Sequence, residues 1–266
     1  MARSALLNVM VQAALKAGKS LSRDFGEVQN LQVSVKGPGD FVSQADFKAE
    51  KIIREELMKA RPTYGFLGEE SEEIIGTDGA HRWIVDPLDG TTNFLHGIPL
   101  FAVSIGLERN GEIVAGVIFN PGTDELYTAE RGGGAFLNDR RLRVAGRRVL
   151  SDCVVTCGIP HLGRGNHGKF LVELRHVMSE VAGVRSVGSA ALDLAYVAAG
   201  RFDGMWQVGL SPWDVAAGIL LIREADGFLS DADGGNDMLG KGTVVCGNEY
   251  IQKALIEVVK RPIPTR

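Results

Sequence analysis

Residues 84–94 read Ile-Val-Asp-Pro-Leu-Asp-Gly-Thr-Thr-Asn-Phe. An apolar run ends here in two aspartates, Asp86 and Asp89, which enclose a Pro-Leu pair and are followed at once by a glycine and two threonines. Two carboxylates this close repel each other unless a cation lies between them. Pro87 fixes its own φ angle and biases Asp86 toward an extended backbone. The stretch therefore predicts a stiff segment that holds two acidic side chains in place.

The residues around these aspartates indicate what they could bind. We expect a short buried strand over residues 82–85, and ligands in open α/β architectures lie beyond the carboxyl ends of strands. Gly90 lets the backbone approach a ligand closely, and a helical turn that opens at Thr91 would point its N–H groups at an anion such as phosphate. Carboxylates beside a phosphate favour Mg²⁺. The alternative is an ordinary turn with capping aspartates, since Asp-Pro and Asp-Gly are common turn pairs.

Three further acidic residues are candidates for the same site. Glu69 opens a run of acids at residues 69–73, which is usually a solvated face, but residues 66–68 are typical of a strand end from which Glu69 could project. Asp46 and Asp214 each lie three residues after a serine, and both segments match a helix capping box. Local sequence does not separate a capping aspartate from one that binds a metal, so both interpretations stay open.

The rest of the chain alternates between helical and strand patterns. Apolar residues at helical spacing between Leu6 and Leu21 predict an amphipathic helix, and Asn110-Gly111 predicts a hairpin turn. Further helices are expected at residues 40–61, 166–181, 190–200 and 215–225, and further strands at residues 100–107, 112–119, 126–129, 134–137, 154–157 and 202–207. These patterns indicate an α+β protein with two layered halves, residues 1–150 and 151–266, that share a site at their junction.

Composition argues against several classes of function. The chain has 266 residues, 45% hydrophobic and 23% charged, and its net charge of −4 with scattered basic residues gives no reason to expect direct nucleic-acid binding. Its longest apolar runs are far shorter than the ~20 residues of a membrane helix, and the N-terminus does not read as a secretory signal, so we expect a cytoplasmic protein without membrane attachment. The three cysteines have no zinc-type spacing, and P-loop and GxSxG patterns are absent. Any metal would be held by oxygen.

In order and spacing these motifs resemble the signatures of the inositol monophosphatase family. The resemblance rests on Gly-Glu-Glu-Ser at residues 68–71, on the central stretch at residues 83–94, and on Trp213-Asp214 followed by Glu-Ala-Asp-Gly at residues 224–227. It covers nearly the whole chain, and the central motif is highly specific. The resemblance implies a layered αβαβα sandwich of the type shared with fructose-1,6-bisphosphatases, and a magnesium-dependent phosphatase that lithium inhibits.

The resemblance also implies a metal set. A first Mg²⁺ would be held by Glu69, Asp86 and the carbonyl of Leu88, and a second by Asp86, Asp89 and Asp214. A third, weaker ion would depend on Glu69 and water molecules, which gives two to three ions in all. In this interpretation the two aspartates enclose Pro-Leu because they share one metal while they bind different sides of a two-metal site.

The resemblance further implies which residues would bind the substrate and the attacking water. The backbone N–H groups of Gly90 and Thr91 would receive the phosphate, and the Thr91 hydroxyl together with Asp46 would orient the attacking water. Beyond Asp89 and Asp214, the residues implied on the polyol side of the substrate are Gly188, Ser189, Ala190 and Gln207.

One residue departs from the family pattern. Gln207 stands where the family usually has a substrate-binding glutamate, so hydrolysis of inositol 1-phosphate is expected while strict inositol specificity stays open. A sugar phosphate, histidinol phosphate or a nucleotide are the alternative substrates. Bacterial members can also act as accessory partners of the transcription machinery, so a protein-binding role with retained phosphatase activity is a further alternative. Homodimers are common in the family, and we expect one here.

Overall fold

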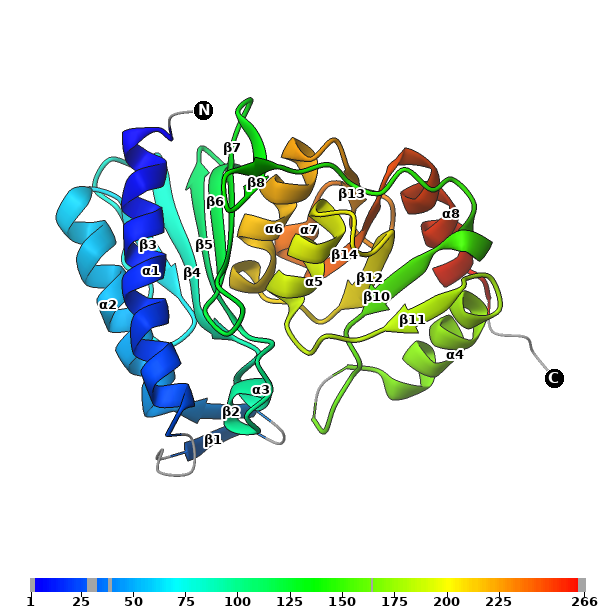
Figure 1. The fold of residues 1–266 in the computed structure, drawn as a ribbon, viewed down its shortest axis with the longest axis horizontal. Coiled ribbons are helices and arrows are strands. Elements are labelled where there is room, and N and C mark those ends of the chain that lie inside the picture. The colour runs from blue at the N-terminus through cyan, green and yellow to red at the C-terminus, as the bar shows by residue number, and fades with distance from the viewer. Residues whose placement is uncertain (1–2, 28–32, 38–39, 164, 263–266) are drawn as a thin grey trace.

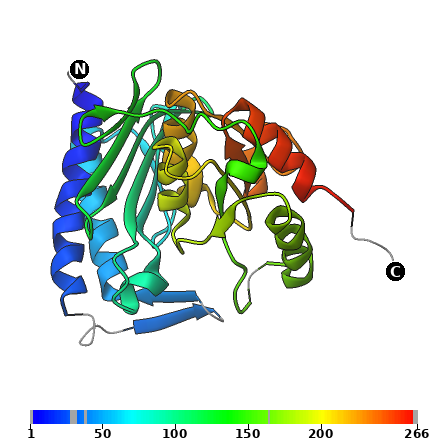
Figure 2. The same ribbon diagram turned by 45° about the vertical axis from the view of Figure 1, so that its right-hand side comes forward.

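The computed structural model describes residues 3–27, 33–37, 40–163 and 165–262. In this part of the chain, helices and β-sheets alternate in five layers (Figures 1 and 2). A pair of helices covers a seven-stranded sheet, a second helical layer separates that sheet from a five-stranded one, and a last pair of helices covers the far side. The predicted layered αβαβα sandwich is therefore confirmed.

The seven-stranded sheet keeps its strands in chain order. They are β3 (Gly65–Gly68), β4 (His81–Asp89), β5 (Ala102–Arg109), β6 (Glu112–Asn120), β7 (Glu125–Glu130), β8 (Gly134–Leu137) and β9 (Arg140–Arg141). β3 runs parallel to β4, and every later neighbour is antiparallel. The predicted hairpin turn is confirmed, because Asn110 and Gly111 join β5 to β6 with positive φ angles of 52° and 81°.

Strand β4 differs from the prediction of a strand over residues 82–85. It continues through both aspartates to Asp89, and its pairing with β5 skips a step: Asp86 lies opposite Ser104 and Asp89 opposite Ala102. Three steps along β4 thus match two along β5, which is the signature of a β-bulge. Pro87 is tolerated there because a bulge does not need its missing N–H.

Helices α1 (Ala5–Phe25) and α2 (Gln44–Ala60) cover the outer face of this sheet. Met10, Ala13, Ala17 and Leu21 are fully buried against it, as the amphipathic pattern predicts. The predicted helix at residues 40–61 begins too early. Asp40–Ser43 instead form strand β2, which pairs with β1 (Val33–Gly37), and the helix cannot begin before Ser43 because that residue is its extended N-cap.

The middle layer is formed by α5 (Ala190–Ala198), α6 (Pro212–Glu224) and the short α7 (Met238–Lys241). Residues Val215–Ile222 of α6 are buried on every side, which explains their unbroken apolar run. Two glycines let α6 lie directly on the large sheet. A Cβ added to Gly106 would lie 2.8 Å from the Ala216 Cβ, and one added to Gly116 would lie 2.9 Å from the Ala217 carbonyl oxygen.

The second sheet has the order β11-β10-β12-β14-β13. Its strands are β10 (Val154–Cys157), β11 (Gly183–Arg185), β12 (Gly204–Val208), β13 (Phe228–Ser230) and β14 (Thr243–Gly247), and it follows the short 3₁₀ helix η2 (Leu150–Asp152). Helices α4 (His167–Met178) and α8 (Glu249–Val259) pack on its outer face. The division into residues 1–150 and 151–266 stays a prediction. Among the described residues, no helix has both the length and the apolar character to cross a membrane.

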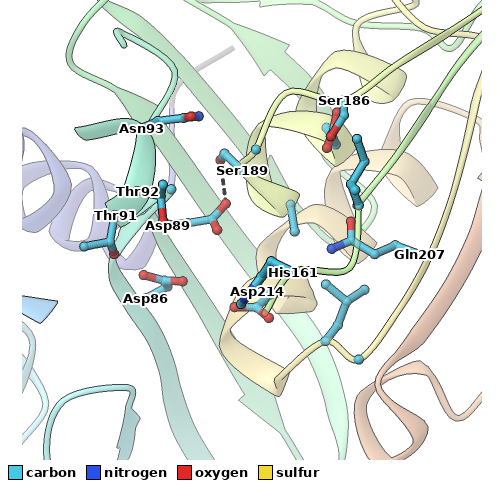
Figure 3. A pocket seen from close by; sticks show the side chains of 18 of the residues that line it. Asp86, Asp89, Thr91, Thr92, Asn93, His161, Ser186, Ser189, Gln207 and Asp214 are labelled. Carbon is cyan, nitrogen blue, oxygen red and sulfur yellow. Dashed lines mark hydrogen bonds between the residues drawn. The ribbon is translucent and has the colours of Figure 1, made fainter. Parts of the chain in front are cut away.

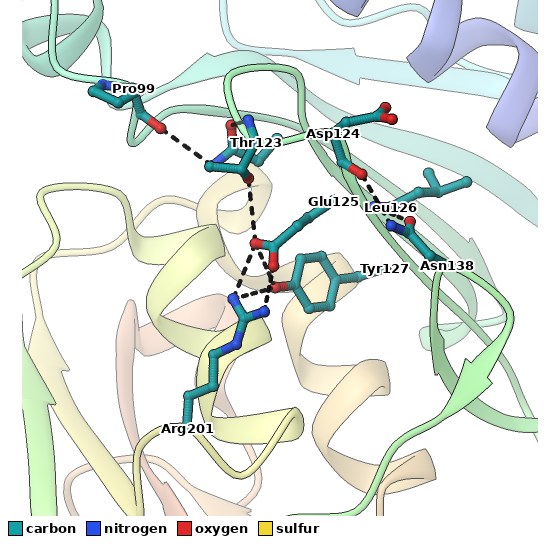
Figure 4. Close-up of polar contacts among 9 residues, drawn as sticks. Pro99, Thr123, Asp124, Glu125, Leu126, Tyr127, Asn138 and Arg201 are labelled. Atoms are coloured by element: carbon teal, nitrogen blue, oxygen red, sulfur yellow. Dashed lines mark hydrogen bonds and ion pairs between the residues drawn. The ribbon is translucent and has the colours of Figure 1, made fainter.

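A polar cluster joins the large sheet to the residues that follow α5 (Figure 4). Arg201 pairs with Glu125 on β7, with its Nη1 2.9 Å from Oε2, and the hydroxyl of Tyr127 donates to the same oxygen at 3.0 Å. The Arg201 guanidinium also lies 4.8 Å from the centre of the Tyr196 ring. These contacts keep the middle layer in register with the sheet at a point outside the candidate site.

The close packing of α6 on the large sheet leads to a prediction about stability. Gly116→Val should destabilise the fold by about 1–3 kcal/mol, because the added atoms overlap α6 and force it outward. Thermal melting and chemical denaturation measure the change. Gly146→Ala is the control, since its Cβ would meet nothing within 4 Å and should change stability by no more than about 0.5 kcal/mol. A Gly116→Val protein as stable as the control would contradict the packing argument.

Candidate active site

A cavity of about 530 Å³ lies where β4, α3 (Thr91–Leu95), α5 and α6 meet (Figure 3). Among the residues that line it are eleven of the twelve that the sequence singled out: Glu69, Asp86, Leu88, Asp89, Gly90, Thr91, Gly188, Ser189, Ala190, Gln207 and Asp214. The twelfth, Asp46, lies behind the wall and is fully buried. Its Oδ1 accepts a hydrogen bond of 3.1 Å from the Thr91 hydroxyl.

Three aspartates converge in this cavity. Asp86, Asp89 and Asp214 each present a carboxylate oxygen, and these atoms lie within 4.8 Å of one another. The β4 bulge explains the first two, because residues three apart on a regular strand face opposite sides of a sheet. Ile84 packs in the middle layer whereas Val85 and Leu88 pack on the outer side, so the extra residue returns Asp89 to the side of Asp86. Asp214 reaches the same point from the first turn of α6.

Glu69 joins this cluster through the topology of the sheet. It follows β3, which is parallel to β4, and its backbone N–H donates to the Val85 carbonyl at 3.2 Å. Later acids of the same run differ, because Glu72 and Glu73 are exposed and Glu73 pairs with Arg82. The solvated-face interpretation thus holds for the end of the run, while Glu69 lines the cavity.

Burial and mutual repulsion perturb these carboxylates. Burial raises the pKa of Asp86 well above its ordinary value, and the charges of Glu69, Asp89 and Asp214 raise it further. Burial also raises the pKa of Asp89 to about 6, although hydrogen bonds from Ser189 and Ala191 act in the opposite direction. A divalent cation between the acids would relieve both effects. All the donors are oxygens, and this donor set fits Mg²⁺.

Hydrogen bonds fix which face of Asp89 is available. Its Oδ2 accepts from the Ser189 hydroxyl at 2.5 Å and from the Ala191 N–H at 2.7 Å, both at the start of α5 (Figure 3). These two bonds leave Oδ1 as the oxygen with lone pairs to offer to a cation. The start of α5 therefore holds one oxygen of the Asp89 carboxylate, and the other oxygen is available to the acidic cluster.

The capping predictions are confirmed for both serine–aspartate segments. Asp214 Oδ2 accepts from the Ser211 N–H at 2.8 Å and closes a capping box on α6. Asp46 Oδ2 accepts from the N–H and hydroxyl of Ser43 at 2.9 and 2.7 Å, which leaves Oδ1 for Thr91. Capping and a place at the cavity are thus compatible, because a carboxylate has two oxygens.

The predicted helical turn at Thr91 is also confirmed. Helix α3 begins after Gly90, whose φ of 92° is accessible to glycine and strained for other residues. The Thr91 hydroxyl lies 3.0 Å from the Leu88 carbonyl oxygen as well as near Asp46. The first N–H groups of this turn therefore lie beside the acidic cluster, at the edge of the cavity.

Several features of the cavity were not predicted from the sequence. Asn93 and Asp193 line the cavity, as does the loop at residues 158–162. Asp193 lies 2.5 Å from the Thr156 hydroxyl, and burial raises its pKa to about 8. Gln207 Oε1 is buried without a hydrogen-bond partner in the described structure. For Asn93 a signal existed, since it belongs to the central motif, but its neutral amide suggested no chemistry.

Comparisons with known proteins agree with this geometry. A profile of the inositol monophosphatase family matches residues 2–263. An inositol-1-monophosphatase of Rhizobium meliloti is 77% identical over 266 residues, all of both chains. The Nus factor SuhB of Pseudomonas aeruginosa is 43% identical and covers 97% of each chain. A crystal structure of the extragenic suppressor protein suhB from Bartonella henselae superposes with a TM-score of 0.95 at 66% identity, and covers 98% of this chain and 100% of its own.

The raised pKa values predict how pH changes the response to Mg²⁺. In the metal-free protein the folded pKa of Asp89, about 6, lies above its ordinary 3.8, so ionisation destabilises the fold progressively as pH rises from about 4 through 6. Mg²⁺ competes with those protons, so it should raise the melting temperature clearly at pH 7.5 and much less at pH 5.

Melting scans with and without Mg²⁺ at the two pH values, at constant ionic strength, measure this difference. Asp89→Asn is the control, because without that carboxylate the melting temperature should gain less from Mg²⁺ at pH 7.5. An equal Mg²⁺ effect at both pH values would contradict metal binding by these acids.

Proposed function

The chain belongs to the inositol monophosphatase family and is a phosphatase, and from this premise we propose that its cavity hydrolyses inositol 1-phosphate to inositol and phosphate with Mg²⁺. The observation that carries the proposal is the convergence of Asp86, Asp89 and Asp214 beside the first turn of α3. Acids that repel one another next to exposed backbone N–H groups suit a metal-bound phosphate monoester. A phosphate-release assay over a panel of monoesters, with Mg²⁺ and with chelator, tests it directly.

The metal ligands that we propose are those that membership of the family implies. Glu69, Asp86 and the Leu88 carbonyl would hold one ion, and Asp86, Asp89 and Asp214 a second. A third, weaker ion would rest on Glu69 and water. When bound, such ions lower the pKa of a water molecule and neutralise charge on the transferred phosphate and the leaving alkoxide.

The chain's own groups position the reactants. Asp46, held by Ser43, accepts a hydrogen bond from the Thr91 hydroxyl, so the Thr91 oxygen keeps lone pairs with which to accept a hydrogen bond from a water molecule. The N–H groups of Gly90 and Thr91 would receive the phosphate oxygens. In phosphoryl transfer most of the work of the protein is this positioning and the stabilisation of charge.

The opposite wall of the cavity would bind the alcohol part of the substrate. Gly188, Ser189 and Ala190 lie there at the start of α5, and Gln207 lies on β12. Gln207 lines this wall, and its side-chain amide can exchange hydrogen bonds with substrate hydroxyls. A polyol phosphate therefore suits both walls. A sugar phosphate, histidinol phosphate or a nucleotide are the alternative substrates.

A second role is favoured by the relatives rather than by the cavity. The Pseudomonas relative is named Nus factor SuhB, a name that refers to transcription. It is similar to this chain over nearly its whole length. We therefore propose, as the alternative, a protein-binding role in the transcription machinery in which phosphatase activity is retained. We propose a homodimer and a cytoplasmic location in either case.

The metal assignment predicts the effect of single carboxylate substitutions. Asp89→Asn and Asp214→Asn should each lower kcat by ~10²-fold or more while the protein stays folded, because each removes a ligand charge without opening a cavity. If Asp214 acts only as a cap, its change to Asn should cost at most ~1 kcal/mol of stability and little activity. Steady-state kinetics and thermal melting together distinguish these outcomes.

A matched control for this experiment is Asp237→Asn. Asp237 caps α7 through a 3.0 Å bond from the Gly240 N–H and does not line the cavity. Its substitution should change stability by a similar small amount and leave kcat near wild type. Near-normal turnover in Asp214→Asn would remove Asp214 from the metal set.

The place of Gln207 on the cavity wall leads to a prediction about substrate selectivity. A charged acceptor contributes about 1.5–3 kcal/mol to a hydrogen bond against about 0.5–1.5 for a neutral one. Gln207→Glu should therefore raise kcat/KM for inositol 1-phosphate roughly tenfold, mainly through KM, since the contact lies away from phosphorus. Glycerol 2-phosphate, with fewer hydroxyls, should gain much less. An unchanged ratio of kcat/KM between the two substrates would place Gln207 outside the substrate site.

A further inference from the structure

Asn93 joins two segments that are far apart in the sequence. Its side-chain Nδ2 donates to the Leu100 carbonyl oxygen at 2.7 Å and to the Val187 carbonyl oxygen at 2.8 Å. An amide nitrogen has two hydrogens, so both are used. Figure 3 shows the side chain reaching from α3 toward the segment that leads into Ser189. Leu100 precedes β5, whereas Val187 lies between Ser186 and Gly188, which line the cavity on the α5 side.

Little space is left here for a side chain at Gly90 or Gly188. A Cβ added to Gly188, whose φ is 78°, would lie 2.8 Å from Asn93 Nδ2, and one added to Gly90 would lie 3.3 Å from the Gly188 carbonyl oxygen. The amide plane of Asn93 therefore packs directly on the Gly188 backbone. The turn that begins α3 and the segment before α5 are therefore in contact here, and Asn93 forms a side-chain hydrogen bond between them.

A second link crosses the same junction. Asp89 accepts from the Ser189 hydroxyl and the Ala191 N–H, two to four residues beyond Val187. Asn93 thus fixes the start of a short segment whose other end orients a carboxylate of the acidic cluster. Any displacement of Val187 would move Ser189 and Ala191 relative to Asp89.

We propose that Asn93 is a positioning residue, a latch that holds the segment 187–191 against β4 and α3 and so sets the orientation of Asp89 for hydrolysis. The proposal rests on the proposed function for its effect on turnover, but the latch itself is a statement about structure. Both amide hydrogens of Asn93 are used in these backbone contacts, so the side chain has no donor left for a substrate.

Asn93→Asp is the sharpest test. The change keeps the shape of the side chain but places a carboxylate oxygen against two carbonyl oxygens, so attraction becomes repulsion. We expect kcat for phosphate release to fall at least tenfold, and amide hydrogen exchange at Ala191, measured without metal, to accelerate at least tenfold. Inhibition by inorganic phosphate should change less than threefold, because Gly90 and Thr91 are held by the backbone of α3 itself.

Asn248 provides a matched control. Its Nδ2 also donates to two carbonyl oxygens, those of Ala145 and Arg147, at 2.8 and 2.6 Å, and it does not line the cavity. Asn248→Asp introduces the same repulsion and keeps the acceptor that caps α8. It should lower the melting temperature while kcat and the exchange of Ala191 stay within threefold of wild type.

The outcomes separate the latch from a general loss of stability. If Asn93→Asp retains kcat, or if both variants accelerate Ala191 exchange equally, Asn93 only stabilises the fold and the proposal is overturned. If Asn93→Asp does not accumulate as folded protein, Asn93→Ala takes its place, with the same expected direction and Asn248→Ala as its control. A wild-type protein that releases no phosphate from any ester refutes the proposed function, while the exchange measurement still decides the latch.

Discussion

The single extra residue in β4 is the constraint on which the rest of the site depends. Without it, Asp86 and Asp89 would face different layers of the sandwich, one toward the cavity and one into the apolar space beneath α1 and α2. The bulge puts both on one side and lets proline occupy a central strand, where it would otherwise remove a ladder hydrogen bond. Asp214 and Glu69 come close to these two carboxylates and complete the acidic cluster beside the turn of α3.

The site reuses groups that the fold already needs. Asp46 and Asp214 are capping residues, and in each the carboxylate serves the helix end while it lies at or behind the cavity wall. A cap fixes the side chain in one orientation, so little further ordering is required when a ligand binds. The glycines under α6 have a related effect, since the depth at which that helix lies on the sheet sets where Asp214 can reach.

Much of this arrangement could be predicted from the sequence, where periodicity and caps act locally. The hairpin at Asn110, the amphipathic face of α1 and the capped start of α6 follow from short-range rules. The bulge did not, because a proline after Asp86 is equally typical of a strand end, and only the pairing with β5 shows that the strand continues. Strands β11, β13 and β14 and helix α8 were not predicted. The contact of Asn93 depends on a partner 94 residues away in the sequence, so no local pattern indicates it.

The buried acids also affect which substitutions such a protein tolerates in evolution. In the metal-free state each of them is a source of internal repulsion, so substitutions that remove a charge here relax the fold rather than damage it. Loss of hydrolysis is therefore an easy step for this scaffold, and a descendant without catalysis would keep its layers and its outer surfaces intact.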